Sequence, residues 1–262
     1  MSALIRAELL KLRTVRTTPW LLVLTAALTA LIVVVTVVQI VTGDTTYNGN
    51  EALRSVVGGV GTAGGHLVML CLGIMSLGGE FRHNTITPTL LVEPRRPRMV
   101  AAKLVGITLV GLLFAVVAVA LAVAVAAPWL AGTGHQVSFA DGEFWLQILG
   151  NVLVLVLYGL IGFGLGVLIR NQVVAIVLAI IWVFLLEPVL SAVSARWFSW
   201  LAPYLPGSAA ASLQRTVVPE GAEGAQFIPH YLPMWGGGLV LLAYALLFTA
   251  AGSAFVLNRD VT

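Results

Sequence analysis

The sequence predicts an all-α protein that crosses a membrane several times, and three observations lead to this fold class. The chain of 262 residues has a mean hydropathy of +1.01, and 59% of its residues are hydrophobic. Only 10% of its residues are charged, whereas a soluble domain carries about 25%. Several apolar runs reach the length of about 20 residues that a helix needs to span a bilayer. We therefore expect a single transmembrane domain over residues 1–262.

Six apolar runs predict six transmembrane helices. They cover residues 20–41, 60–77, 104–130, 145–169, 173–193 and 237–257. The second run is the weakest of them, because it contains His66 and four glycines. An even number of crossings places both ends of the chain on the same side of the membrane.

Residues 1–18 predict an amphipathic helix that lies on the membrane surface. Leucines and charged residues alternate there: Leu4, Arg6, Glu8, Leu9, Leu10, Lys11, Leu12 and Arg13. Such a helix rests its apolar face among the headgroups and brings its cations to anionic lipid. The alternative is an ordinary basic flank that only sets topology. The apolar run that follows is too long for a cleavable signal peptide.

The distribution of basic residues predicts the orientation. Only three of the 14 lysines and arginines fall on the side opposite to the chain ends: Arg54, Arg196 and Arg215. Cytoplasmic loops are enriched in lysine and arginine. We therefore expect both termini and residues 78–103 to be cytoplasmic, and the acidic loop 131–144 to be external.

The polar segment 78–103, between the second and third runs, predicts a short cytoplasmic helix parallel to the membrane. Residues that accept backbone N–H groups at a helix start are present, namely Asn84, Thr85 and Thr87. Pro94 and Pro97 would end this helix. A soluble partner gripping it would move both attached spans. The alternative is a basic loop without a partner, and the basic residues expected at lipid headgroups are Arg95, Arg96, Arg98 and Lys103.

The stretch 194–236 is long for a plain connection between the last two spans. It is rich in aromatic residues and prolines, and it includes a helix-like sequence near Ser208. Aromatic side chains favour the membrane interface. We expect short helices that enter the outer leaflet and return, and the alternative is a surface loop with aromatic anchors.

Glu187 is an ionisable residue in the fifth span, and Pro188 follows it. A charged group within a span costs about 2.5 to 3.5 kcal/mol on insertion scales, so it faces protein or water. One interpretation is a substrate or gating contact near the outer mouth. The other is a structural carboxyl that bonds to the outer-loop backbone or pairs with Arg196.

Glycines in the fourth span predict close helix packing. Gly162 and Gly166 have the GxxxG spacing that lets two helix backbones approach. The neighbouring helix belongs either to the same chain or to a second subunit.

Several catalytic classes lack their motif in this sequence. Both lysines, Lys11 and Lys103, are followed by leucine, so the chain has no phosphate-binding loop and should not hydrolyse ATP. The HExxH motif of metalloproteases and the GxSxG nucleophile elbow are also missing. The four histidines lie in segments expected at different depths, and we expect no metal site.

The start ELLKLRTVRTTPWLL and the string GGEFRHNTITPTLLVEPRRPRMVAAK resemble permease subunits of type-two ABC exporters, particularly those of Gram-positive and actinobacterial bacteria. In that family the loop between spans two and three reads E-[FY]-R-x-x-T-x-x-x-x-L, followed by a proline, basic residues and an Ala-Lys pair. The residues that match are Glu80, Phe81, Arg82, Thr85, Leu90, Pro94, Arg96, Arg98, Ala102 and Lys103.

The resemblance implies a permease of the cytoplasmic membrane that pairs with a second permease and with ABC ATPase subunits. It implies that ATP and magnesium bind to the partner, that the loop carries a coupling helix, and that the N-terminal helix lies against the ATPase. The coupling contacts would be Glu80, Phe81, Arg82, Thr85 and Leu90. The alternatives are an ion-driven secondary transporter, a membrane enzyme, and a non-transporting sensor or immunity protein of the same architecture.

Overall fold

The structure, a computed structural model, describes residues 2–43, 47, 50–60, 64–82, 96–217 and 232–254. Over these residues the chain is helical, without a β-strand. The longer helices are α1 (Ser2–Thr14), α2 (Thr17–Thr42), α3 (Glu51–Val60), α4 (His66–Arg82), α6 (Arg96–Gly132), α7 (Gly142–Ile169), α8 (Gln172–Ile181), α9 (Glu187–Trp197), α10 (Pro206–Gln214) and α11 (Met234–Gly252). A π-helical turn (Trp182–Leu186) joins α8 to α9, and a 3-10 turn (Ala202–Tyr204) precedes α10.

Five helical segments are long and apolar enough to cross a membrane: Thr17–Thr42, Pro97–Gly132, Gly142–Ile169, Gln172–Ser194 and Met234–Gly252. They correspond to five of the six predicted runs and confirm the all-helical membrane fold class. The second predicted run, 60–77, instead begins at the last residue of α3 and continues in α4, whose apolar part, His66–Glu80, is shorter than a full span. Gly64 has a φ of +87°, a left-handed conformation that interrupts a helix and suits glycine.

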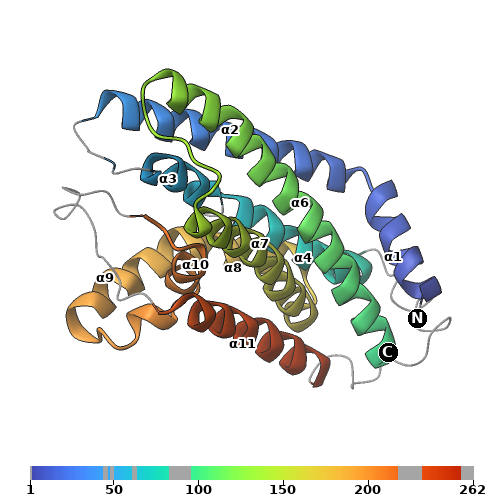
Figure 1. Cartoon of the computed structure of the whole chain (residues 1–262). Helices are drawn as coiled ribbons and strands as arrows, with labels where there is room; N and C mark the ends of the chain where they lie inside the picture. Colours follow the sequence, from blue (N-terminus) through green and yellow to red (C-terminus); the bar gives the residue numbers. More distant parts are fainter. Residues whose placement is uncertain are drawn as a thin grey trace.

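Helix α7 is the centre of the fold, and it packs against α4, α6, α10 and α11 (Figure 1). Its apolar window is 67% buried, compared with 22% for α2 and 11% for the segment containing α8 and α9. The poorly buried segments expose rows of large apolar side chains, as expected for surfaces that face lipid.

Glycines bring α4 and α7 into backbone contact. A Cβ on Gly162 would overlap the carbonyl oxygen of Leu70, and one on Gly166 would lie 2.7 Å from that of Ile74. A Cβ on Gly73 would lie 2.7 Å from the backbone nitrogen of Phe163. The GxxxG spacing in α7 therefore serves packing within this chain, the first of the two alternatives that the sequence left open.

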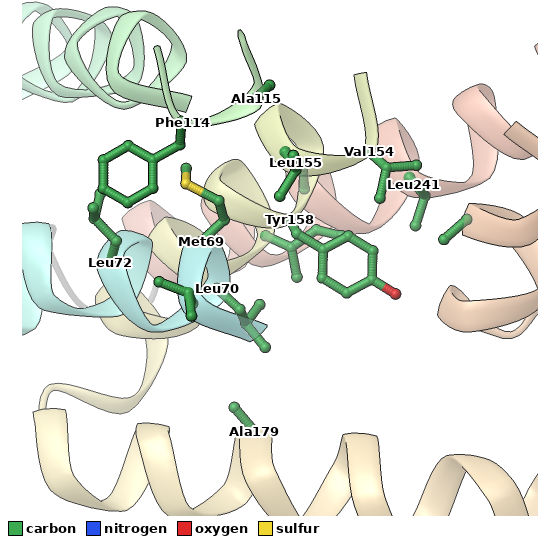
Figure 2. Packing of buried hydrophobic residues seen from close by; sticks show 14 of the residues in the cluster. Met69, Leu70, Leu72, Phe114, Ala115, Val154, Leu155, Tyr158, Ala179 and Leu241 are labelled. Carbon is green, nitrogen blue, oxygen red and sulfur yellow. The ribbon is translucent and has the colours of Figure 1, made fainter. Parts of the chain in front are cut away.

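Side chains fill the space around this glycine contact. Met69, Leu72 and Phe114 pack on one side of α7, and Val154 and Leu241 lie toward α11 (Figure 2). A second buried cluster joins α2, α3 and α6 around Val33, Val56 and Ala122.

Part of the stretch 194–236 folds onto the bundle. Helix α10 packs against α7 and α11, and its Ala209 and Leu213 are buried. A Cβ on Gly150 of α7 would overlap the carbonyl oxygen of Leu213, so this approach is also close. Residues 218–231 lie outside the described residues.

We predict that Gly162→Ala destabilises the protein by about 3 kcal/mol, because the added methyl meets backbone atoms that have no room to move. The thermal unfolding midpoint in detergent micelles measures this loss. Gly142→Ala is the matched control, since a Cβ there meets nothing within 4 Å. Equal midpoints for the two variants would contradict the close α4–α7 contact.

Candidate functional site

Four charged side chains from three helices form a cluster at one end of the bundle. Glu8 and Lys11 come from α1, Glu80 from the last turn of α4, and Lys103 from the first part of α6. Helix α1 packs against α6, beside its N-terminal end (Figure 1). The last turn of α4 and the first turn of α6, which flank residues 83–95 in the sequence, lie at this same end.

The four side chains form a chain of ion pairs, which we call the α1–α4–α6 cluster. The Lys103 ammonium donates to Glu80 Oε1 at 2.6 Å and to Glu8 Oε1 at 2.7 Å. Glu80 Oε1 also accepts a hydrogen bond from Lys11. Two carboxylates therefore balance two ammonium groups.

Two members of this cluster are almost completely buried, so the stability of the fold depends on their pairing. Lys103 is 1% exposed and Glu80 is 4% exposed, whereas the Lys11 side chain remains 40% exposed. Removing one member of a buried ion pair costs about 3–5 kcal/mol, because the remaining charge stays buried without a partner. Glu80 Oε2 is also buried and has no hydrogen-bond partner among the described residues.

The predicted coupling and headgroup residues fall into four groups. The structure brings Glu80 and Lys103 together and buries both, while the ATPase contact predicted for Glu80 and the headgroup contact predicted for Lys103 stay predictions. Arg98 is exposed at the start of α6. The structure gives only the backbone position for Phe81 and Arg82 at the end of α4 and for Arg96 at the start of α6, while Thr85, Leu90 and Arg95 lie outside the described residues.

Sequence reasoning missed the partners that α1 supplies. The amphipathic pattern predicts a surface position for Glu8 and Lys11, yet Glu8 pairs with Lys103 of α6 and Lys11 pairs with Glu80 of α4. Their spacing of three residues places them on one face of a helix, and this was the available signal. Nothing local indicates their partners, since Glu8 and Lys103 are 95 positions apart.

The opposite end of the bundle carries a second polar cluster. Asn50 donates to the Ser138 carbonyl at 2.8 Å and to Asp141 at 3.2 Å, while Glu143 pairs with Arg54 at 3.5 Å and with Arg215. Desolvation acts to raise the pKa of Asp141, but hydrogen bonds from Asn50 and from backbone N–H groups, with the nearby Arg54 charge, lower it overall. These contacts fasten the start of α3 to the α6–α7 connection.

Glu187 bonds to the backbone at the start of α10, within the stretch 194–236. For a structural role of this carboxyl, the sequence offered such a backbone bond or a pair with Arg196. Its Oε1 accepts a hydrogen bond from the Gly207 N–H, and the Trp182 side chain also bonds to it. Gly207 permits the approach, since a Cβ there would lie 2.7 Å from Glu187 Oε1.

Glu187 lines the larger of two adjoining cavities. The larger measures about 420 Å³ and is bounded by α4, α7, the π-helical turn, α9 and α10. The smaller, about 200 Å³, is apolar and runs between α7, α8 and α11. Tyr158 and Val183 line both, and Figure 2 shows Leu70 and Tyr158 facing Ala179 on the opposite wall of the smaller cavity.

Apolar helices with polar clusters at both ends define a multi-pass membrane protein. Residues 18–247 match the family model described as ABC-2 family transporter protein, and the chain belongs to this family. It is therefore a transmembrane permease subunit of an ABC transporter. Such subunits lack ATPase activity, which a partner subunit supplies. A comparison with curated proteins finds no match.

We predict that Lys103→Met lowers the stability of the protein by about 3–5 kcal/mol, because Glu8 and Glu80 lose the cation between them. Thermal unfolding in detergent micelles provides the measurement. Arg98→Met is the control, because Arg98 is exposed on the same helix and its loss should cost no more than about 0.5 kcal/mol. Unfolding of both variants at the wild-type temperature would contradict the structural role of the cluster.

Proposed function

We propose that this permease forms half of an export path and is driven by an ATPase subunit that docks on residues 78–103. The α1–α4–α6 cluster is the observation that carries this proposal, because it ties the ends of both flanking helices to α1. A force applied to the connection between α4 and α6 would reach three helices at once. A partner shifts a conformational equilibrium only through contacts that differ between the two states, and this connection would supply them.

The division of roles within this segment is also part of the proposal. Phe81, Arg82, Thr85 and Leu90 would contact the ATPase, while Arg95, Arg96 and Arg98 would hold lipid headgroups. Glu80 and Lys103, being buried, would act by keeping α1, α4 and α6 together. ATP and magnesium would bind to the partner.

We further propose six crossings, with α3 and α4 together forming the interrupted second one. Contacts at both ends support this: Asn50, before α3, bonds to the α6–α7 connection, and Glu80, at the end of α4, bonds to the start of α6. Helix α10 and the turn before it would form the segment that enters the outer leaflet and returns. A second permease, identical or related, would complete the path against one of the exposed apolar faces.

The end that carries the α1–α4–α6 cluster would face the cytoplasm of a bacterial cell, with both chain termini on that side. The basic residues of the described chain support this orientation, since Arg54, Arg196 and Arg215 lie toward the other end and the remaining ones lie at the cluster end. Lysine and arginine favour the cytoplasmic side.

The docking proposal predicts that Arg82→Ala combined with Thr85→Ala weakens binding of the cognate ATPase subunit about tenfold, because charged and polar anchors of an interface are lost. Co-purification and stimulated ATP hydrolysis in proteoliposomes measure the effect. Arg196→Ala, which removes an exposed arginine at the opposite end, should change neither. Undiminished binding and hydrolysis in the double variant would refute docking at this segment.

The orientation proposal predicts opposite labelling of two single cysteines in a Cys71→Ser background. A membrane-impermeant maleimide should label Thr133→Cys in intact cells, because Thr133 is exposed in the α6–α7 connection. It should label Arg98→Cys only after the cells are permeabilised. The reverse pattern would overturn the orientation.

A further inference from the structure

The larger cavity beside Glu187 has the size and lining of a binding site for a small molecule. Its volume of about 420 Å³ lies within the range of ligand pockets. Polar side chains are concentrated on its wall: His66, Glu187, Ser191, Ser208 and Gln214. The adjoining cavity of about 200 Å³ is almost purely apolar. Since both share Tyr158 and Val183, one elongated molecule could occupy the two together.

The charge of this lining selects for a cation. Among the described residues that line the larger cavity, Glu187 is the single acidic residue and no lysine or arginine is present. An anionic ligand would meet the carboxylate without a counter-charge, and a phospholipid would bring a phosphate with no cation to receive it. A monocation without a phosphate is the ligand that this wall favours.

Gln214 supplies an independent sign of a ligand. Gln214 is one of the residues that line the larger cavity, and its side chain is fully buried, yet neither Nε2 nor Oε1 has a hydrogen-bond partner among the described residues. Buried amides are nearly always paired in folded proteins. A ligand with a hydrogen-bonding group would satisfy this amide while it occupies the cavity.

The backbone around Glu187 holds the carboxylate at the cavity wall. The π-helical turn Trp182–Leu186 ends directly before it, and such turns are frequent at functional sites. The Gly207 N–H and the Trp182 side chain fix the carboxyl group. The position of the negative charge is thus set by the protein before any ligand binds.

From these observations we infer that the two cavities bind an amphipathic organic monocation. Its charged group pairs with Glu187, a hydrogen-bonding group meets Gln214, and its apolar part extends past Tyr158 between α7 and α8. The inference rests on the proposed function in one respect, that this cation is the exported substrate.

Binding is tested with the full chain in phosphatidylcholine nanodiscs, without nucleotide and without an ATPase subunit. The probe is rhodamine 6G, an amphipathic fluorescent cation, and its binding is followed by fluorescence anisotropy against empty nanodiscs. We expect decylamine to displace the dye, and decanol and decanoate to compete at least about tenfold more weakly, because a charge-assisted hydrogen bond is stronger than a neutral one. Equal competition by decanol would overturn the role of charge.

Two variants locate the site. Glu187→Gln keeps an oxygen that accepts the Gly207 N–H and should weaken dye binding about tenfold or more. Gln214→Met breaks no hydrogen bond to the described residues and should weaken dye binding without lowering the unfolding temperature. Asp141→Asn removes a carboxylate away from the cavity, still caps α7 and should bind the dye normally. Wild-type affinity in Glu187→Gln would overturn the inference.

Further experiments distinguish a free cation from a lipid amine as the ligand. They also distinguish failure of this inference from failure of the proposed export function. Adding phosphatidylethanolamine to the nanodiscs should leave the dye affinity unchanged, and loss of dye binding would point to a lipid amine and refute the inference. If the dye binds in a Glu187-dependent way but is not transported when ATP and the ATPase subunit are present, only the export of this cation is refuted. If the chain does not bind the dye but transports another solute with ATP, only the cation site is refuted.

Discussion

Close backbone approach along α7 is the constraint on which the rest of the structure depends. Lipid tails are as apolar as leucine side chains, so helices in a membrane gain little from burying apolar surface against each other. Glycines at the contacts of α7 with α4 and α10 remove the side chains that would hold the backbones apart. Dispersion contacts then accumulate over the whole length of the helix, and α7 becomes the most buried of the long apolar segments.

Polar groups are distributed around this apolar centre in a way that suits transmission of motion. The ion pairs gather at one end, where Lys103 links α1, α4 and α6, and hydrogen bonds and ion pairs gather at the other around Asn50 and Glu143. Both ends are therefore held together by polar contacts between helices. The segment that contains α8 and α9 is the least buried of the apolar helices, so it has the fewest contacts to break when the bundle changes shape.

The cavities lie where this loosely held segment meets α7. Their walls come in part from α7, the most buried of the long apolar segments, and in part from the α8–α9 segment, the least buried. A movement of α4 would change the shape of the larger cavity, because His66 and Leu67 of α4 form part of its wall. The charged cluster at the end of α4 and the cavity beside its first turn are thus joined by one helix.

The sequence by itself determined the long apolar helices, the polar segment between α4 and α6, and the resemblance that the family match confirmed, because hydropathy and motif spacing are local properties of the chain. The break at Gly64 was only hinted at by the glycines of the second run. Tertiary structure alone decided that Glu8 and Lys11 meet Glu80 and Lys103, and that Glu187 meets Gly207 beside a cavity. Such partners depend on which helix faces which, and in this chain backbone contacts between distant helices set that arrangement.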